Sequence, residues 1–198
     1  MSNSLPVTFA MTGASGAPYA VRLLELLNQN GIPVQLVVSE TGWRLLEEEL
    51  GIVGEQQLRA RTGDWSRVTL YSDQDRGATP ASGSAPSRGM VVCPCSMGTL
   101  ASIAQGTTRS LIERAADVVL KERRTLILVP RETPYSLIHL QNMTRLTKAG
   151  AIILPASPGF YHRPKSIDDL VDFIAGRILA HLAVDAGVGP RWQSGELD

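Results

Sequence analysis

The sequence predicts a single α/β domain built on a doubly wound parallel sheet. Short apolar runs that suit buried strands alternate with amphipathic stretches that suit helices along the chain. The runs hold four to six residues and are apolar at successive positions, as strands covered on both faces are. No internal repeat or second domain interrupts the alternation. A Rossmann- or flavodoxin-like fold with helices on both faces follows, and such folds bind ligands at the carboxyl edge of the sheet.

Size and composition narrow the class of protein. The 198 residues suffice for a sizeable core, and we divide them into a tail at 1–6, one domain at 7–185 and a tail at 186–198. The 19 basic and 19 acidic residues cancel, which argues against nucleic acid as a bulk electrostatic partner. No apolar run reaches the roughly 18 residues of a membrane span, and residues 1–6 do not resemble a signal sequence. Two cysteines are too few for a disulfide framework, so we expect a cytoplasmic protein.

The first predicted unit is a strand, a turn and a helix. An apolar run from Val7 breaks into the small residues Thr12-Gly13-Ala14-Ser15-Gly16-Ala17. Pro18 suits the first turn of the following helix, which ends at Asn30-Gly31. Small residues let backbone N–H groups approach an anion, so a phosphate is the expected guest, although such turns also serve as plain connectors. Neither GxxxxGK[ST] nor GxGxxG is present, so ATP and dinucleotides are not indicated.

The second predicted unit contains a run of three glutamates. The apolar strand Val34–Val38 ends at Ser39, and Thr41 is expected to cap a helix over Gly42–Leu50. Within that helix, Glu47-Glu48-Glu49 is mostly a solvated face. Because consecutive helical residues point in different directions, one of the three carboxylates can still point inward.

The rest of the chain repeats strand, turn and helix after one irregular stretch. Residues 51–88 form that stretch, with a short strand expected at Val68–Tyr71 and a loop at 80–84, and long polar loops are often functional. The elements expected after it are a strand at Met90–Val92, a turn at Cys93–Thr99 leading into a helix, a helix at Leu111–Glu122, a strand at Thr125–Val129, a turn at Pro130–Pro134, a helix at Tyr135–Lys148, a strand at Ala151–Leu154, a loop at Pro155–Lys165 and a helix at Ile167–Val184.

Four small or charged turns directly follow predicted strands, at Gly13–Ser15, Ser39, Ser96–Thr99 and Arg131-Glu132. In a parallel sheet such turns meet at one edge, which favours a ligand site over unrelated connectors. The hydroxyls of the third turn stand at a helix N-terminus, where they can bind a phosphate or a ring carbonyl. The fourth turn places a cation beside a carboxylate, which suits phosphate binding and proton transfer.

Two motifs suggest metals, and neither is favoured. Cys93 and Cys95 lack the further Cys or His ligands of a zinc site, and small apolar packing is the commoner role of such cysteines. The run Asp168-Asp169-Leu170-Val171-Asp172 spells DDxxD, a magnesium motif of prenyl-diphosphate enzymes. Ser166 suits an N-cap, however, and acidic residues favour the first turn of a helix. We expect packing in the first case and capping in the second.

With these stretches assembled, the chain resembles the flavin prenyltransferases of the UbiX family. The matching segments are MTGASGAPYAVRLLE, CPCSMGTLASIAQG, LIERAADVVLKERRTLILVPRETPYSLIHLQNM and GAIILPASPGFYHRPKSIDDLVDFIAGRIL, which span nearly the whole chain. The resemblance implies a homododecamer in which dimethylallyl monophosphate alkylates reduced flavin mononucleotide (FMN). The product, prenylated FMN, would be the cofactor of UbiD-type decarboxylases that serve ubiquinone synthesis or aromatic-acid breakdown.

The resemblance also implies residue roles. Flavin would be held by Gly13, Ala14, Ser15, Ser39, Ser96, Met97, Gly98, Thr99 and Arg131. The prenyl phosphate would be bound, partly across subunit interfaces, by Ser82, Arg114, Lys121, Tyr161 and Arg177, with Trp192 closing over the site. Glu49 and Glu132 would be the catalytic carboxylates, assisted by Ser15, and we expect Glu132 to relay the proton. Arg, Lys and Tyr side chains can supply the charge that a departing monophosphate needs, so no metal is expected.

Other functions remain open. Cysteine decarboxylases of the related homo-oligomeric flavin-containing type carry PASANT and PxMNxxMW where this chain has PCSMGT and PRETPYSLIHL, so the residues favour prenyl transfer. A direct aromatic-acid decarboxylase finds no chemistry here beyond making the cofactor. A non-catalytic flavin carrier would share the fold and the flavin pocket but has no need of Glu49, Glu132 and the phosphate-binding set. A diphosphate donor is also open, although the weak metal motifs favour the monophosphate.

Overall fold

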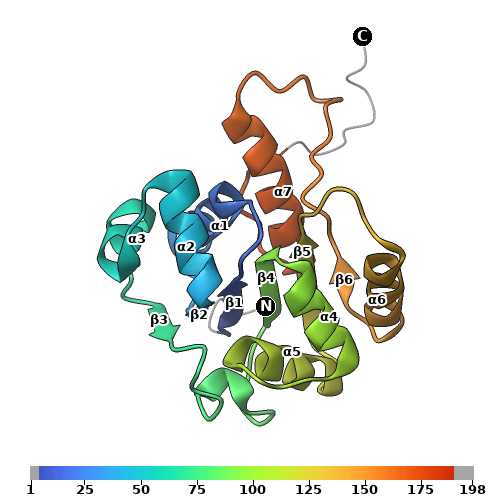
Figure 1. Cartoon of the computed structure of the whole chain (residues 1–198). Coiled ribbons are helices and arrows are strands. Elements are labelled where there is room, and N and C mark those ends of the chain that lie inside the picture. The colour runs from blue at the N-terminus through green and yellow to red at the C-terminus, as the bar shows by residue number, and fades with distance from the viewer. Residues whose placement is uncertain (1–4, 190–198) are drawn as a thin grey trace.

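The computed structural model describes residues 5–189, and within them the chain forms one parallel β-sheet of six strands (Figure 1). The strands are Val7–Met11 (β1), Val34–Val38 (β2), Val68–Tyr71 (β3), Gly89–Cys95 (β4), Thr125–Pro130 (β5) and Ile152–Ile153 (β6). The helices are Ala17–Gln29 (α1), Glu40–Leu50 (α2), Gly54–Thr62 (α3), Met97–Gln105 (α4), Leu111–Lys121 (α5), Leu137–Lys148 (α6) and Ile167–His181 (α7), with a short 3-10 turn at Thr79–Ala81 (η1).

The strand order is β3-β2-β1-β4-β5-β6, so the direction of winding reverses between β1 and β4. Helices α1, α2, α3 and α7 contribute to the core on one face of the sheet, and α4, α5 and α6 contribute to the core on the other. The predicted doubly wound α/β fold is confirmed. Its ligand site is expected in the crevice at the carboxyl ends of β1 and β4, where the order reverses.

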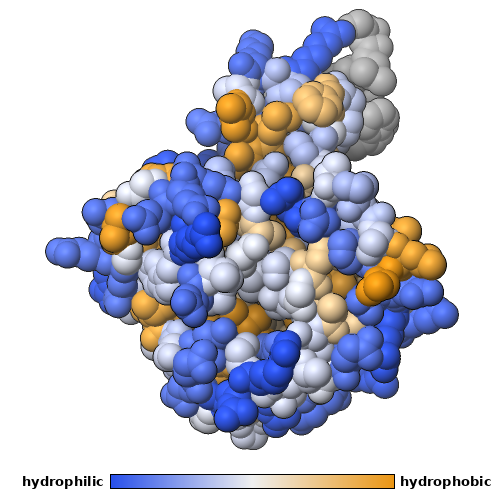
Figure 2. Space-filling view, viewed as in Figure 1, coloured by the Kyte–Doolittle hydropathy of each residue, from blue (hydrophilic) through white to orange (hydrophobic). Residues whose placement is uncertain are grey.

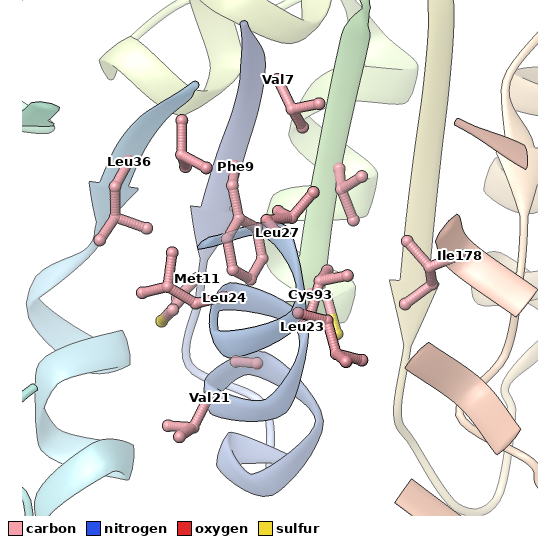
Figure 3. Close-up of a cluster of buried hydrophobic side chains, with 14 of the residues drawn as sticks. Val7, Phe9, Met11, Val21, Leu23, Leu24, Leu27, Leu36, Cys93 and Ile178 are labelled. Carbon is pink, nitrogen blue, oxygen red and sulfur yellow. The ribbon is translucent and has the colours of Figure 1, made fainter. Parts of the chain in front are cut away.

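Successive strand residues serve the two opposite cores. In β1, Phe9 packs into the core that holds α1, and Figure 3 shows its ring beside Leu24 and Leu27 of that helix. The next residue, Ala10, packs into the core on the other face. Both residues are fully buried. This alternation explains why the strands are continuously apolar, since neither face of the sheet meets water.

Serine begins most of the helices. In each case its side-chain oxygen accepts a hydrogen bond from a backbone N–H of the first turn, which satisfies a donor that the helix itself cannot pair. The N-cap serines are Ser39 (α2), Ser96 (α4), Ser110 (α5), Ser136 (α6) and Ser166 (α7). The predicted cap at Thr41 is therefore wrong. Helix α2 begins two residues earlier than expected, because Ser39 Oγ accepts from Gly42 N at 3.0 Å.

Other boundaries also differ from those expected. Strand β4 continues through Cys93-Pro94-Cys95, where a turn was expected, because Cys95 still pairs with Pro130 of β5. Helix α3 was not predicted at all. It buries only Leu58 and Thr62, so its sequence lacks an apolar stripe. Helix α6 begins at Leu137 instead of Tyr135, α7 ends at His181 instead of Val184, and β6 keeps only Ile152–Ile153.

None of the helices within residues 5–189 is long and apolar enough to span a membrane.

Candidate functional site

The four predicted turns follow β1, β2, β4 and β5, which are neighbours in the sheet and run parallel. They therefore share its carboxyl edge, as the sequence predicted. Backbone hydrogen bonds join them. Ser39 N donates to Met11 O at 3.0 Å, and Thr12 N donates to Pro94 O at 3.2 Å. The turn after β1 lies in the middle of this arrangement and contacts each of its neighbours.

The side chain of Thr12 links the ends of β1 and β4. Its hydroxyl donates to Pro94 O at 2.9 Å and accepts from Ser96 N at 2.8 Å. Thr12 is only 2% exposed, so water cannot replace these partners. The bonds fix the start of the Ser96–Thr99 turn relative to the Gly13–Ser15 turn.

Gly13 allows α2 to approach the turn after β1. A Cβ at this position would overlap the hydroxyl of Thr41 in the first turn of α2. Gly42 has the same role from the other side, since its Cβ would come within 2.6 Å of Met11 O. Ser39 and Thr41 thereby lie next to the turn, with their hydroxyl oxygens 3.2 Å apart.

The peptide group between Ser15 and Gly16 is held at both of its ends. Arg131 Nε donates to Ser15 O at 3.2 Å, and Gly16 N donates to the two carboxylate oxygens of Glu49 at 3.0 and 3.2 Å. Glu49 also accepts from Ala17 N at 2.8 Å. Of the three consecutive glutamates Glu47, Glu48 and Glu49, the first two are exposed and only Glu49 is half-buried. The expectation that one of them points inward is met by this residue.

Glu49 occupies the place at which the sequence suggested a phosphate. The first N–H groups of α1 form an anion site, but in this structure a carboxylate of the same chain binds there. Donors that remain suited to a ligand at this edge are the half-buried hydroxyls of Ser15, Ser39, Ser96 and Thr99 and the exposed guanidinium of Arg131.

Glu132 follows Arg131 at the same edge and is half-buried. Its Oε1 accepts from its neighbour Thr133 N at 3.0 Å, which leaves the second carboxylate oxygen without a hydrogen bond to the described residues. Glu49 and Glu132 thus belong to segments that meet at the Ser15–Gly16 peptide group: one binds its N–H, and the other follows the arginine that binds its carbonyl.

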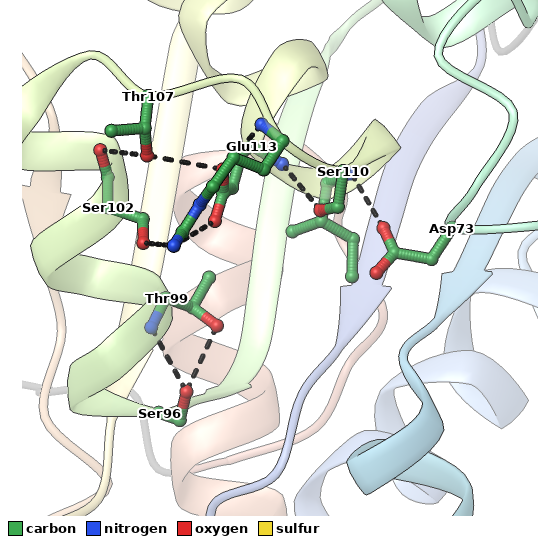
Figure 4. Close-up of polar contacts among 9 residues, drawn as sticks. Asp73, Ser96, Thr99, Ser102, Thr107, Ser110 and Glu113 are labelled. Carbon is green, nitrogen blue, oxygen red and sulfur yellow. Dashed lines mark hydrogen bonds and ion pairs between the residues drawn. The ribbon is translucent and has the colours of Figure 1, made fainter.

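The turn after β4 carries the second set of hydroxyls (Figure 4). Ser96 Oγ accepts from Thr99 N at 3.2 Å and lies 3.0 Å from Thr99 Oγ1. Met97 is buried in the core, whereas Gly98 is exposed. Of the predicted flavin contacts in this turn, Met97 can therefore offer its backbone but not its side chain.

A polar cluster next to this turn serves α5 instead of the site. Glu113 is 8% exposed and accepts from Arg109 N at 2.7 Å and from Arg109 Nη2 at 3.0 Å (Figure 4). Thr107 Oγ1 also lies 3.2 Å from its carboxylate. Burial raises the pKa of Glu113, but the hydrogen bonds from Arg109 outweigh burial and the net shift is downward.

Part of the predicted phosphate set lies far from this edge in the same chain. Ser82 follows η1, and the adjacent Gly83 O accepts from Arg124, which immediately precedes β5. Lys121, at the end of α5, forms an ion pair with Glu122. Both residues therefore lie near the amino edge of the sheet. Arg114 lies on α5 and pairs with Asp117 at 2.8 Å.

Tyr161 and Arg177 come from the segment after β6. Tyr161 is 62% exposed and packs edge-on against Phe173 of α7, with ring centroids 6.0 Å apart. Arg177 lies one helical turn beyond Phe173 and is exposed. The predicted lid residue Trp192 lies outside the described residues.

The metal-like motifs have structural roles. Cys93 and Cys95 are free and fully buried, and burial raises the pKa of the Cys95 thiol to about 12 and that of Cys93 further still. Ser166 and Asp169 form a capping box at the start of α7, as the capping interpretation predicted. Asp172 forms an ion pair with Arg22 at 2.6 Å. Residues 5–189 contain no group of three or more His, Cys, Asp or Glu side chains suited to a metal ion.

Sequence reasoning missed two contributors to the edge. Thr12 was grouped with the turn and given no role of its own, and the close approach of Gly42 to β1 was not anticipated. A hydroxyl at the end of an otherwise apolar strand is the signal that could have marked Thr12, since a buried hydroxyl must find partners.

The sequence and the fold are similar to those of known flavoproteins. The sequence matches the Flavoprotein family over residues 1–179. The flavin prenyltransferase UbiX of Pseudomonas aeruginosa is 46% identical over 200 residues, which cover 97% of this chain and 96% of that protein. A crystal structure of AnUbiX (PadA1) in complex with FMN and dimethylallyl pyrophosphate superposes with a TM-score of 0.90 at 40% identity, over 98% of this chain and all of the other. A dodecameric FMN-dependent UbiX-like decarboxylase from Escherichia coli gives a TM-score of 0.88 at 39% identity, over 96% of this chain and 100% of that one.

Proposed function

The chain belongs to the flavoprotein family and, within it, to the UbiX flavin prenyltransferases, and from this premise we propose that dimethylallyl monophosphate is its prenyl donor. The chain is a flavin prenyltransferase, and FMN is its cofactor. The single phosphate of the donor, the roles of individual residues, the assembly and the recipient of the product are proposals. The contacts at the carboxyl edge of the sheet support the second of these, the roles of individual residues.

One observation carries the proposed roles. Arg131 and Glu49 bind opposite ends of the Ser15–Gly16 peptide group, and Glu132 directly follows Arg131. A cation, two carboxylates and the Ser15 hydroxyl are therefore gathered at the edge where doubly wound sheets bind their ligands. A protein that only carried flavin would not need the two carboxylates.

The residues at this edge suit FMN. Hydroxyls on Ser15, Ser39, Ser96 and Thr99 can donate to phosphate oxygens or to the carbonyls of the flavin ring, and Arg131 offers a fixed cation. The approach of α2 over Gly13 and Gly42 keeps Ser39 within this group. When bound, reduced FMN supplies the electron-rich ring that accepts the prenyl group.

The proposed donor loses its phosphate as the allylic carbon–oxygen bond breaks, which leaves an allylic cation and an anion. Fixed cationic and phenolic donors stabilise that anion without a metal. We assign this work to Ser82, Arg114, Lys121, Tyr161 and Arg177. A single phosphate suits such a set better than a diphosphate, which usually needs Mg²⁺ to neutralise its larger charge.

Glu132 is the proposed proton carrier. The ring carbon that gains the prenyl group must lose its proton, and the departing phosphate can accept one. Glu132 keeps a carboxylate oxygen that makes no hydrogen bond to the described residues, so this oxygen can take the proton and pass it on. Glu49, which accepts hydrogen bonds from backbone N–H groups, orients the Ser15 turn.

A homo-oligomer explains where the phosphate set lies. Ser82 and Lys121 are at the amino edge of the sheet, whereas Glu132 and Arg131 are at the carboxyl edge, so one chain cannot bring them together. A second copy can supply the missing residues. Exposed apolar side chains offer contact surfaces, notably Leu137 at 69% and Ile138 at 66% on α6 (Figure 2). We propose a dodecamer, the assembly reported for the relative from Escherichia coli.

The recipient and the location are further proposals. We propose that prenylated FMN passes to a UbiD-type decarboxylase, on the support of family membership. We also propose a cytoplasmic location, which the two free and buried cysteines support, because an oxidising compartment favours disulfides.

The experiment that tests the proposed function is a product analysis. The purified protein is incubated without oxygen with reduced FMN and dimethylallyl monophosphate, and with EDTA in place of any metal. Mass spectrometry should find the flavin heavier by one five-carbon prenyl unit. A parallel reaction receives dimethylallyl diphosphate and Mg²⁺. Product in that reaction alone would refute the monophosphate, and FMN that binds but stays unmodified in both would favour the carrier or decarboxylase alternatives.

A further inference from the structure

We propose that Thr12 is a positioning residue for flavin binding, because its buried hydroxyl sets the distance between the two turns that hold the cofactor. The inference rests on the proposed function, since it assumes that FMN occupies the carboxyl edge between β1 and β4. Thr12 is not itself assigned a contact with flavin or with the prenyl donor.

The contacts of Thr12 span the point where the strand order reverses. Its hydroxyl donates to Pro94 O at 2.9 Å and accepts from Ser96 N at 2.8 Å. The hydroxyl therefore acts both as a hydrogen-bond donor and as an acceptor. Ser96 is the N-cap of α4, and Ser15 lies three residues after Thr12. The two turns proposed to bind FMN are thus joined through a single side-chain oxygen.

Burial makes this link costly to lose. Thr12 is 2% exposed, so a residue without the hydroxyl would leave Ser96 N–H without its acceptor. Pro94 O keeps its bond from Thr12 N at 3.2 Å, so the strands remain paired. The Ser96–Thr99 turn is therefore the part expected to shift, and it is the part that would hold the flavin.

Strand β1, which directly precedes Thr12, provides a matched control. Thr8 lies on β1, four residues before Thr12, which directly follows the strand, and is also 2% exposed. Its hydroxyl donates to Gln35 Oε1 at 3.0 Å, near the start of the strands and away from the carboxyl edge. Thr8→Val removes an equally buried hydroxyl from β1 without touching either turn.

The test measures FMN affinity by fluorescence quenching, together with visible circular dichroism of the saturated complex and thermal denaturation of each variant. Thr12→Val should raise the Kd for FMN about tenfold and change the dichroism of the bound flavin. Thr12→Ser, which keeps the hydroxyl, should restore the Kd to within about threefold of the wild type. Thr8→Val should lower Tm like Thr12→Val and leave both flavin readouts unchanged.

Two outcomes overturn the inference. A Thr12→Val protein that binds FMN as tightly as Thr8→Val, with the same dichroism, would show that Thr12 only stabilises the fold. Wild-type protein that binds no FMN would overturn the proposed function and this inference with it. Thr12→Ala is made in parallel, so that a folded variant without the hydroxyl is available if valine is not accommodated.

Discussion

The carboxylate of Glu49 accepts hydrogen bonds from the backbone N–H of Gly16 at 3.0 and 3.2 Å. The two residues lie 33 positions apart, and their contact fastens the last turn of α2 to the first turn of α1. A negative charge at this position also compensates the partial positive charge of the helix N-terminus. Glu49 therefore supports both the fold and the proposed site.

We expect Glu49→Gln to lower the free energy of unfolding by about 1–2 kcal/mol, because the amide loses the charge and one acceptor oxygen. Prenylated FMN should form at least about tenfold more slowly. Glu48→Gln is the matched control, since Glu48 is exposed and forms an exposed ion pair with Arg44, and it should change stability by less than about 0.5 kcal/mol. Equal stability and activity of the two variants would contradict the role of Glu49.

Glu132→Gln should separate binding from chemistry. The amide keeps the shape of the side chain but cannot carry a proton, so we expect an unchanged Kd for FMN and product formation about 10²-fold slower or more. The measurements are flavin titration and single-turnover product analysis, with Glu47→Gln on the exposed face of α2 as control. Full activity in Glu132→Gln would rule out the proposed relay.

A site shared between subunits predicts complementation. Lys121→Ala and Glu132→Gln remove residues from opposite edges of the sheet, so each homo-oligomer should be nearly inactive. In an oligomer assembled from both variants, some sites combine the intact edge of each chain, and activity should reappear. The assay compares the two proteins unfolded and refolded together with a mixture of the two refolded separately. If co-refolding restores nothing, each site belongs to one chain.

The ion pair between Arg109 and Glu113, at the start of α5, predicts that the free energy of unfolding depends on pH. The pKa of Glu113 is lowered in the folded state, so its contribution is complete above the pKa of the unfolded carboxyl and is lost as pH falls through the folded pKa. We expect Glu113→Gln to cost about 1–3 kcal/mol at pH 7 and less in acid.

Glu55→Gln is the control for that series. Glu55 also pairs with an arginine four residues away, but its side chain is 47% exposed. The cost of Glu55→Gln should therefore be below about 0.5 kcal/mol. Denaturant titrations between neutral and acidic pH test both variants, and a cost for Glu113→Gln that does not depend on pH would contradict the assignment.

The exposed apolar residues of α6 predict an assembly surface. Leu137→Glu and Ile138→Glu place charges where Leu137 and Ile138 expose apolar side chains, at 69% and 66%. We expect smaller particles by size-exclusion chromatography with light scattering, an intact helical spectrum, and loss of prenyl transfer. Lys148→Glu, at the far end of the same helix, should leave the particle size unchanged. If the protein that carries both Leu137→Glu and Ile138→Glu still formed dodecamers, this surface would not be an interface.

The sequence predicted the sheet and all six of the strands found within residues 5–189, because buried parallel strands are runs of apolar residues. It also predicted that the turns after β1, β2, β4 and β5 meet at one edge. Helix α3 escaped prediction because only Leu58 and Thr62 are buried on it, so its stability comes from neighbours distant in sequence.

The site was less predictable than the fold. Which of three glutamates points inward depends on the angle at which α2 crosses α1, and Gly42 sets how closely α2 approaches β1. The guest of the α1 N-terminus was expected to be a phosphate, but Glu49 binds there, and no local pattern shows a contact across 33 residues. The separation of Lys121 from Glu132 likewise appears only once the strand order is known.

The chain's two cysteines, Cys93 and Cys95, are both enclosed in β4. A thiol-reactive dye would find neither of them on the folded protein, because both thiols are fully buried and stay protonated at neutral pH. One cysteine introduced on the surface would thus be a unique attachment point without removal of the native pair. Donor and acceptor dyes attached in this way to separate batches would report subunit exchange by energy transfer, and the native thiols would become reactive only when the sheet opens.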